Sequence, residues 1–76
     1  MMQQFNKYEI AIYNERVRTA VRQAERNRTG LSTDWADMRY IEVRAETQEA
    51  ARQKIFSRFP QERGFVIEEV RLLEQG

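Results

Sequence analysis

Residues 7–13 alternate between apolar and polar side chains, which predicts a half-buried β-strand. The two faces of this strand carry Tyr8, Ile10 and Ile12 on one side, and Lys7, Glu9 and Tyr13 on the other. The alternation stops at Asn14, a preferred helix N-cap, and Glu15 follows where the helix dipole favours a negative charge. We therefore expect a strand that leads directly into a helix.

The segment after Asn14 has a helical period. Apolar side chains recur at i, i+3, i+4 and i+7 as Val17, Ala20, Val21 and Ala24, which is typical of an amphipathic helix. We expect this helix to extend to about Asn27 and to end at Gly30, because glycine adopts left-handed dihedral angles without strain. Residues 31–37 have no clean period and predict a loop or a short turn of helix.

The second half of the chain predicts a strand, a helix and a further strand. Residues 39–44 alternate as a half-buried strand does, and Thr47 is then placed to cap the start of a helix. The apolar stripe of that helix consists of Ala50, Ala51, Ile55 and Phe59. Pro60 ends the helix, because its ring disfavours the helical conformation of the preceding residue, and Gly64 permits a turn.

The last strand begins at Phe65 and has an irregular pattern. Phe65 and Ile67 would point to one face, and Val70 and Leu72 to the other. A β-bulge near residues 68–69 would return all four side chains to the same face.

The order β-α-β-α-β predicts a small α+β two-layer sandwich with a three-stranded sheet and two helices. We expect a single domain over residues 1–76, with residues 1–4 and 74–76 disordered. One sheet face can take both helices, and the opposite face would then expose Tyr13, Tyr40, Glu42 and Arg44. If each face were covered by one helix, no such exposed face would remain.

Length and composition indicate a folded domain with a thin core. A chain of 76 residues with 33% charged and 41% hydrophobic side chains is folded rather than disordered, but it buries little surface on its own. We therefore expect a second copy of the chain to contribute, as in a homodimer. No apolar run approaches the ~20 residues that span a bilayer, and the first five residues lack the features of a signal peptide. We expect a cytoplasmic protein with no membrane partner.

The composition argues against catalysis. The chain contains no histidine and no cysteine, so the commonest general base, the commonest metal ligand and the best nucleophile are missing. The three glycines are too dispersed for a phosphate-binding loop. Asp34 and Asp37 flank Trp35, and turn chemistry accounts for them better than a metal site does. We expect neither enzymatic activity nor a cofactor.

Basic residues concentrate in the first part of the chain. Residues 1–30 contain six basic and three acidic side chains, a net charge of +3, whereas residues 31–76 contain seven and nine, a net charge of −2. In the first predicted helix Arg18, Arg22 and Arg26 recur at i, i+4 and i+8, a spacing that suits contacts to a phosphate backbone. The alternative is a solvated helix face.

Four side chains are candidates for a protein interface. They are Tyr13, Trp35, Tyr40 and Arg44. Tryptophan is enriched at binding hot spots, although Trp35 could instead be a lid that closes one end of the core. The tyrosines and Arg44 belong to the sheet face that we expect to be exposed, which is an association surface.

Three hypotheses follow for the function. The first is a non-catalytic protein-interaction or adaptor module, acting as a homodimer. The second is a nucleic-acid-binding protein that uses the arginines of the first helix. The third is a non-catalytic small subunit of a larger enzyme complex.

Overall fold

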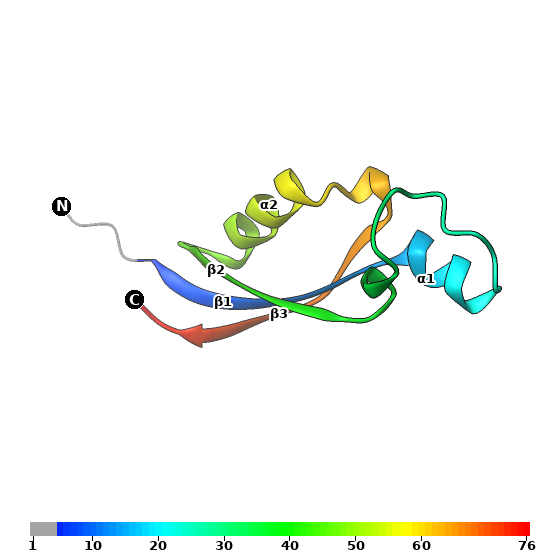
Figure 1. Cartoon of the computed structure of the whole chain (residues 1–76). Coiled ribbons are helices and arrows are strands. Elements are labelled where there is room, and N and C mark those ends of the chain that lie inside the picture. Colours follow the sequence, from blue (N-terminus) through cyan, green and yellow to red (C-terminus); the bar gives the residue numbers. More distant parts are fainter. Residues whose placement is uncertain (1–4) are drawn as a thin grey trace.

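The fold is described from a computed structural model that defines residues 5–76 (Figure 1). Its elements follow the predicted order, with two short 3₁₀ helices added. They are β1 (Asn6–Asn14), α1 (Glu15–Arg22), η1 (Thr33–Ala36), β2 (Arg39–Ala45), α2 (Gln48–Arg58), η2 (Gln61–Arg63) and β3 (Phe65–Glu74).

The three strands form one sheet in the order β2-β1-β3. β1 is central and antiparallel to both neighbours, so β2 and β3 run in the same direction at the two edges. α2 connects these two edge strands and lies across one face of the sheet, which gives the two layers seen in Figure 1. The predicted α+β class with a three-stranded sheet and two helices is confirmed.

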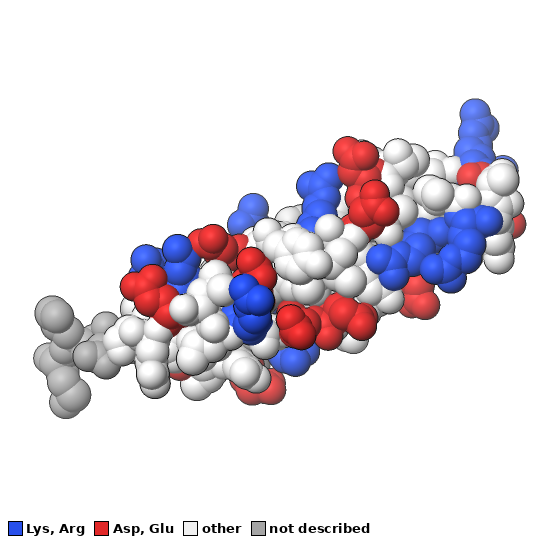
Figure 2. All heavy atoms as spheres, turned by 90° about the horizontal axis from the view of Figure 1, so that it is seen from below, with Lys and Arg blue, Asp and Glu red and all other residues white. Residues whose placement is uncertain are grey.

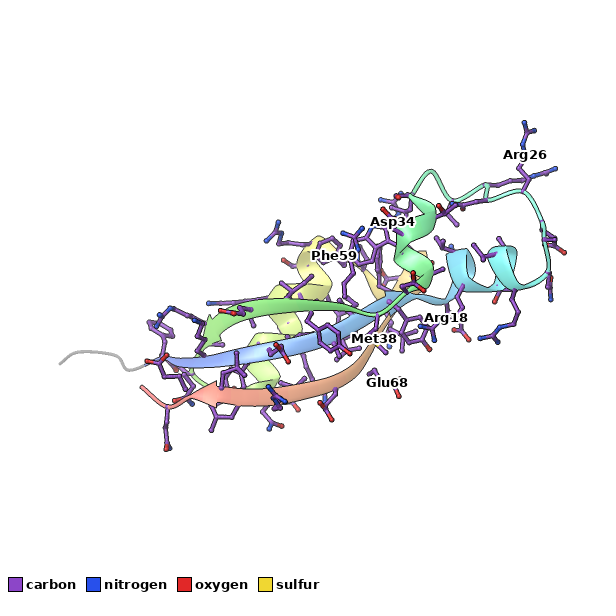
Figure 3. All side chains as sticks on the ribbon, turned by 60° about the horizontal axis from the view of Figure 1, so that its bottom comes forward. Arg18, Arg26, Asp34, Met38, Phe59 and Glu68 are labelled. Atoms are coloured by element: carbon purple, nitrogen blue, oxygen red, sulfur yellow. The ribbon has the colours of Figure 1, made fainter. Side chains whose placement is uncertain are left out.

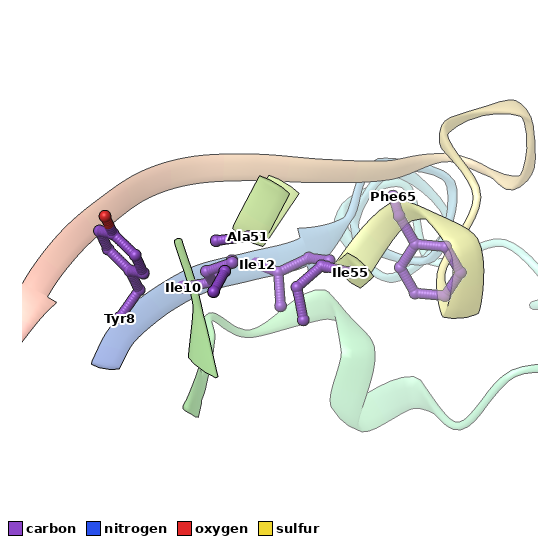
Figure 4. Close-up of a cluster of buried hydrophobic side chains, with 7 residues drawn as sticks. Tyr8, Ile10, Ile12, Ala51, Ile55 and Phe65 are labelled. Carbon is purple, nitrogen blue, oxygen red and sulfur yellow. The ribbon is translucent and has the colours of Figure 1, made fainter. Parts of the chain in front are cut away.

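The core lies between α2 and the sheet. It is formed by Tyr8, Ile10 and Ile12 from β1, Ala45, Ala51, Ile55 and Phe65 (Figure 4). α2 starts where the sequence predicts, because the Thr47 hydroxyl accepts a hydrogen bond of 3.0 Å from the Ala50 amide. It ends at Phe59, before Pro60, and Gly64 then takes a φ of +99° at the turn into β3.

The predicted bulge in the last strand is present. Ala11 of β1 pairs with Glu69 and the next residue, Ile12, pairs with Ile67, so Glu68 is an extra residue in β3. The bulge brings residues 65, 67, 70 and 72 opposite the core-facing positions of β1. A second shift follows between Lys7 and Tyr8.

The first helix is shorter than the sequence suggests. α1 ends at Arg22, and the prediction that it extends to Asn27 and ends at Gly30 is wrong. Its end is a Schellman motif, in which the Glu25 amide bonds to the Ala20 carbonyl at 2.8 Å and the Ala24 amide to the Val21 carbonyl at 3.2 Å. Ala24 occupies the left-handed position with a φ of +54°.

The reason for the early end is the polarity of residues 25–29. This stretch has no apolar side chain, so another turn of helix would bury nothing. The Asn27 side chain instead bonds to Leu31 and Thr29 in a local network that competes with the helix.

α1 does not cover the sheet. The sequence left open whether both helices share one sheet face or each covers one, but α1 continues beyond the end of β1 and contacts η1 more than any strand (Figure 1). Its buried residues, Val17 and Ala20, therefore belong to the part of the molecule where α1 packs against η1. Among the described residues, α2 is the one helix that packs over the sheet face.

Asn14 joins three elements at this end of the sheet. Its Oδ1 atom accepts a hydrogen bond of 3.0 Å from the Val17 amide, which confirms it as the N-cap of α1. Its Nδ2 atom donates to the Arg63 carbonyl at 3.1 Å, and the Glu15 amide bonds to the Gly64 carbonyl at 2.8 Å. The side chain is fully buried, with all its polar atoms paired.

The two terminal predictions differ in outcome. The disorder expected for residues 1–4 lies outside the described residues. β3 extends to Glu74, the first residue of the tail that we expected to be disordered, and the Gly76 amide bonds to the Asn6 side chain at 3.0 Å.

Candidate protein-interaction surface

The sheet face opposite α2 is open within residues 5–76. Alternation along the paired strands places the following residues on it, which we call the open face: Lys7, Glu9, Ala11, Tyr13, Tyr40, Glu42, Arg44, Val66, Glu69, Arg71 and Glu74. Figure 2 views the molecule from this side and shows acidic and basic side chains interspersed along it.

Three of the four predicted interface residues lie on the open face, spread along its length from Arg44 beside Lys7 to Tyr13 beside Val66. Tyr40 is 65% exposed and pairs across the sheet with Ala11. Tyr13 is half-buried, because the Arg18 guanidinium lies 3.6 Å above the centre of its ring. Arg44 is exposed and pairs with Lys7.

Trp35 lies elsewhere. It belongs to η1, and its ring centre lies 5.1 Å from that of Phe59 and 5.0 Å from that of Phe65. Trp35 therefore closes one end of the core, which is the structural alternative that the sequence left open. The guanidinium of Arg39 lies 4.5 Å above its ring and 3.9 Å from Asp34.

The charges of the open face are incompletely matched. Lys7 forms a salt bridge of 2.8 Å with Glu42, and Arg71 lies 3.7 Å from Glu9. Across β1 and β2, however, the register places Glu42 beside Glu9 and Arg44 beside Lys7. Like charges at directly opposed positions are destabilising. Within the described residues Arg44 takes part in no salt bridge.

The three arginines proposed to contact phosphate do not form a stripe. Arg18 and Arg22 lie on α1, but Arg26 lies in the following loop because the helix ends early. The Arg18 Nε atom donates to the Ala36 carbonyl at 2.8 Å. Figure 3 shows Arg18 close to the sheet and Arg26 pointing outward from the loop. The prediction that the three arginines share one helix face is therefore wrong for Arg26.

A different set of arginines shares a groove. Arg16, Arg26 and Arg28 line an open groove of about 790 Å³ between α1 and the loop that follows it. Glu15 and Glu25 line the same groove, so its charge is mixed. These arginines come together because α1 ends at Arg22 and the chain turns there. The sequence did not predict this end, since no glycine marks it.

A lysine at the edge of the sheet was also missed. The Lys54 ammonium on α2 donates a hydrogen bond of 2.6 Å to the Arg44 carbonyl of β2. Nothing in the helical pattern distinguishes Lys54 from any other solvent-facing residue. The contact becomes visible only when α2 is placed over the edge strand.

Neither a metal cluster nor a membrane helix is found in the described part of the chain. No group of three or more Asp or Glu side chains comes together there as a metal site would require. None of its helices has the length and apolar character needed to cross a membrane.

The chain was compared with family models, with curated proteins and with solved structures. None of the three comparisons yields a match.

Proposed function

We propose that the chain is a small non-catalytic protein-interaction or adaptor module that acts as a homodimer through its sheet. The observation that carries this proposal is the incomplete covering of the sheet. α2 packs on one face, while within residues 5–76 no further strand or helix packs across the open face, which meets α1 only where Arg18 lies over Tyr13. No further strand pairs with the outer edges of β2 and β3 in the same residues.

Physical reasoning supports association at such a surface. An edge strand presents unpaired N–H and C=O groups, which bond readily to another strand. Tyr40 adds an exposed aromatic side chain next to that edge, and tyrosine is enriched at protein interfaces. The absence of histidine and cysteine from the sequence favours a binding role over catalysis.

Sedimentation velocity tests the homodimer. We expect twice the chain mass of 9.2 kDa at micromolar concentration. Tyr40→Glu should shift the protein toward monomer, because it adds charge at the surface proposed to be buried. Val21→Glu is the matched control, since Val21 is 51% exposed but lies on α1, away from the sheet. A monomer at every concentration would contradict the homodimer.

Nucleic-acid binding is the second candidate, and the arginine groove is the observation in its favour. Arg16, Arg26 and Arg28 converge there, although two glutamates accompany them. If they contact phosphates, replacing all three with Gln should flatten the log–log salt dependence of affinity by about two to three units. The matched control replaces Arg52, Arg58 and Arg71, which lie outside the groove. Equal weakening by both triple changes would argue against the groove.

A further inference from the structure

The two edges of the sheet differ in their fitness for pairing. β3 contains two register shifts and two adjacent glutamates at its bulge, and bulges and charges are devices that protect an edge. β2 pairs with β1 over seven consecutive residues without a shift and contains neither proline nor glycine. β2 is therefore the edge that another strand can join.

The Lys54 contact identifies which backbone groups of β2 point outward. The ammonium reaches the Arg44 carbonyl from α2, which indicates that this oxygen faces away from β1. In an antiparallel pair every second residue directs its N–H and C=O groups away from the neighbouring strand, so Tyr40 and Glu42 face outward as Arg44 does. A carbonyl oxygen has two lone pairs, so Arg44 can accept a further bond while Lys54 stays in place.

We infer that the occupant of this edge is a second copy of β2, paired antiparallel about a twofold axis at Val43. The inference rests on the homodimer proposed above and specifies its interface. This register is one of the symmetric registers in which the outward-facing backbone groups of the two copies meet. It places Glu42 of each copy opposite Arg44 of the other, so that two such pairs form. Arg44 thereby gains the carboxylate that it lacks among residues 5–76.

The neighbouring registers bring fewer opposite charges face to face. An axis at Glu42 would bring two copies of Glu42 face to face, and like charges directly opposite repel. An axis at Ile41 would place Glu42 opposite Tyr40 and leave Arg44 without a carboxylate. The Val43 register is the one in which both charged side chains of the open-face edge find opposite charges.

The side of the β2 edge that faces α2 is also compatible with an axis at Val43. A groove of about 290 Å³ lies between β2 and α2, lined by Ile41, Val43 and Ile55 and flanked by Lys54 and Arg58. Glu46 and Glu49 lie at the opposite end of the edge, where β2 turns into α2. An antiparallel copy brings its acidic end next to the basic Arg58 and its own Val43 into the seam.

Single-cysteine variants test the register, and the native chain contains no cysteine that would interfere. In the inferred register the two Val43 residues form a non-hydrogen-bonded pair with Cα atoms about 4.5 Å apart. A disulfide requires Cα atoms about 4.4–6.8 Å apart, so Val43→Cys should form covalent dimers under mild oxidation. Ile41→Cys and Glu42→Cys are the matched variants, and neither should cross-link efficiently.

A charge exchange gives an independent readout. Glu42→Arg and Arg44→Glu should each weaken the dimer by about tenfold, because each creates two like-charge pairs across the seam. The double exchange should restore the affinity, since it recreates both pairs with the signs reversed. Glu69→Arg, on the open face but at the β3 edge, should leave the affinity unchanged.

The outcomes separate this inference from the proposed function. Cross-linking at residue 41 or 42 instead of 43, or a double exchange that fails to restore affinity, would overturn the register. A dimer in sedimentation with no cross-link at any of the three positions would place the interface elsewhere and leave the homodimer intact. A monomer throughout would refute both.

Discussion

The buried N-cap offers the most direct test of how this small fold is stabilised. Asn14 caps α1 and also bonds to the Arg63 carbonyl, so one side chain holds the end of β1, the start of α1 and the turn before β3. Asn14→Ala removes both hydrogen bonds from a position that is 0% exposed. The bond to the Val17 amide is buried, and the bond to the Arg63 carbonyl is part-buried.

The expected cost can be worked out from the two bonds. Loss of the cap costs about 1 kcal/mol, and the part-buried Arg63 carbonyl left without its partner costs about 1–3 kcal/mol. Together these give about 2–4 kcal/mol, against a total stability of about 4–11 kcal/mol for a domain of this size. At about 4–8 °C for each kcal/mol, the melting temperature should fall by at least about 8 °C.

Thermal and urea unfolding followed by circular dichroism measure this loss. Thr47→Ala is the matched control, because Thr47 also caps a helix but is exposed and makes no second contact of this kind. It should lower the melting temperature by about 4–8 °C. Asn14→Ser should lie between native and Asn14→Ala, since serine retains a capping oxygen but does not reach Arg63. If Asn14→Ala costs no more than Thr47→Ala, the bond to Arg63 contributes nothing.

Three further predictions concern the backbone and the core. Ala24→Gly should raise the free energy of unfolding by about 1 kcal/mol, because Ala24 is left-handed and glycine adopts that conformation without strain; urea denaturation checks this. Gly64→Ala should lower the melting temperature, since φ is +99° and a Cβ atom would lie 2.8 Å from the Arg16 Cγ atom; an unchanged transition would contradict the turn geometry. Trp35→Ala should cost about 2 kcal/mol or more and Trp35→Phe less, because Trp35 packs against two phenylalanine rings; equal losses in calorimetry would argue against that packing.

Much of the architecture follows from local sequence signals. Asn14 and Thr47 could be identified as caps because their side chains accept hydrogen bonds from nearby amides, an interaction set within a few residues. The bulge at Glu68 could be predicted because the apolar residues of β3 change parity, and burial requires them to share a face. These features depend on neighbours in the sequence.

The features that could not be predicted depend on tertiary placement. α1 ends at Arg22, and the left-handed residue that follows it is Ala24, a residue type that seldom adopts that conformation. Polar residues 25–29 give no stop signal of the usual kind. Because the helix was predicted to continue to Asn27, Arg26 was placed on it, whereas Arg26 lies in the loop after α1. The position of α1 beyond the sheet depends on how Asn14 bonds to the Arg63 carbonyl, forty-nine residues away.

The arginine content of the chain has a structural use that bears on the choice between partners. Arginine's planar guanidinium donates to carbonyls and stacks on rings, which lysine does less well. Arg16 donates to the Glu62 carbonyl at 2.6 Å, and Arg18 bonds to a carbonyl while lying over Tyr13. Arginines at the α1 end thus hold the fold together, which weakens the case that their number indicates a polyanionic partner. Arg44 differs, because it faces Lys7 across the sheet and no carboxylate of the described residues forms a salt bridge with it. A partner strand that supplies a carboxylate would relieve the repulsion between Arg44 and Lys7.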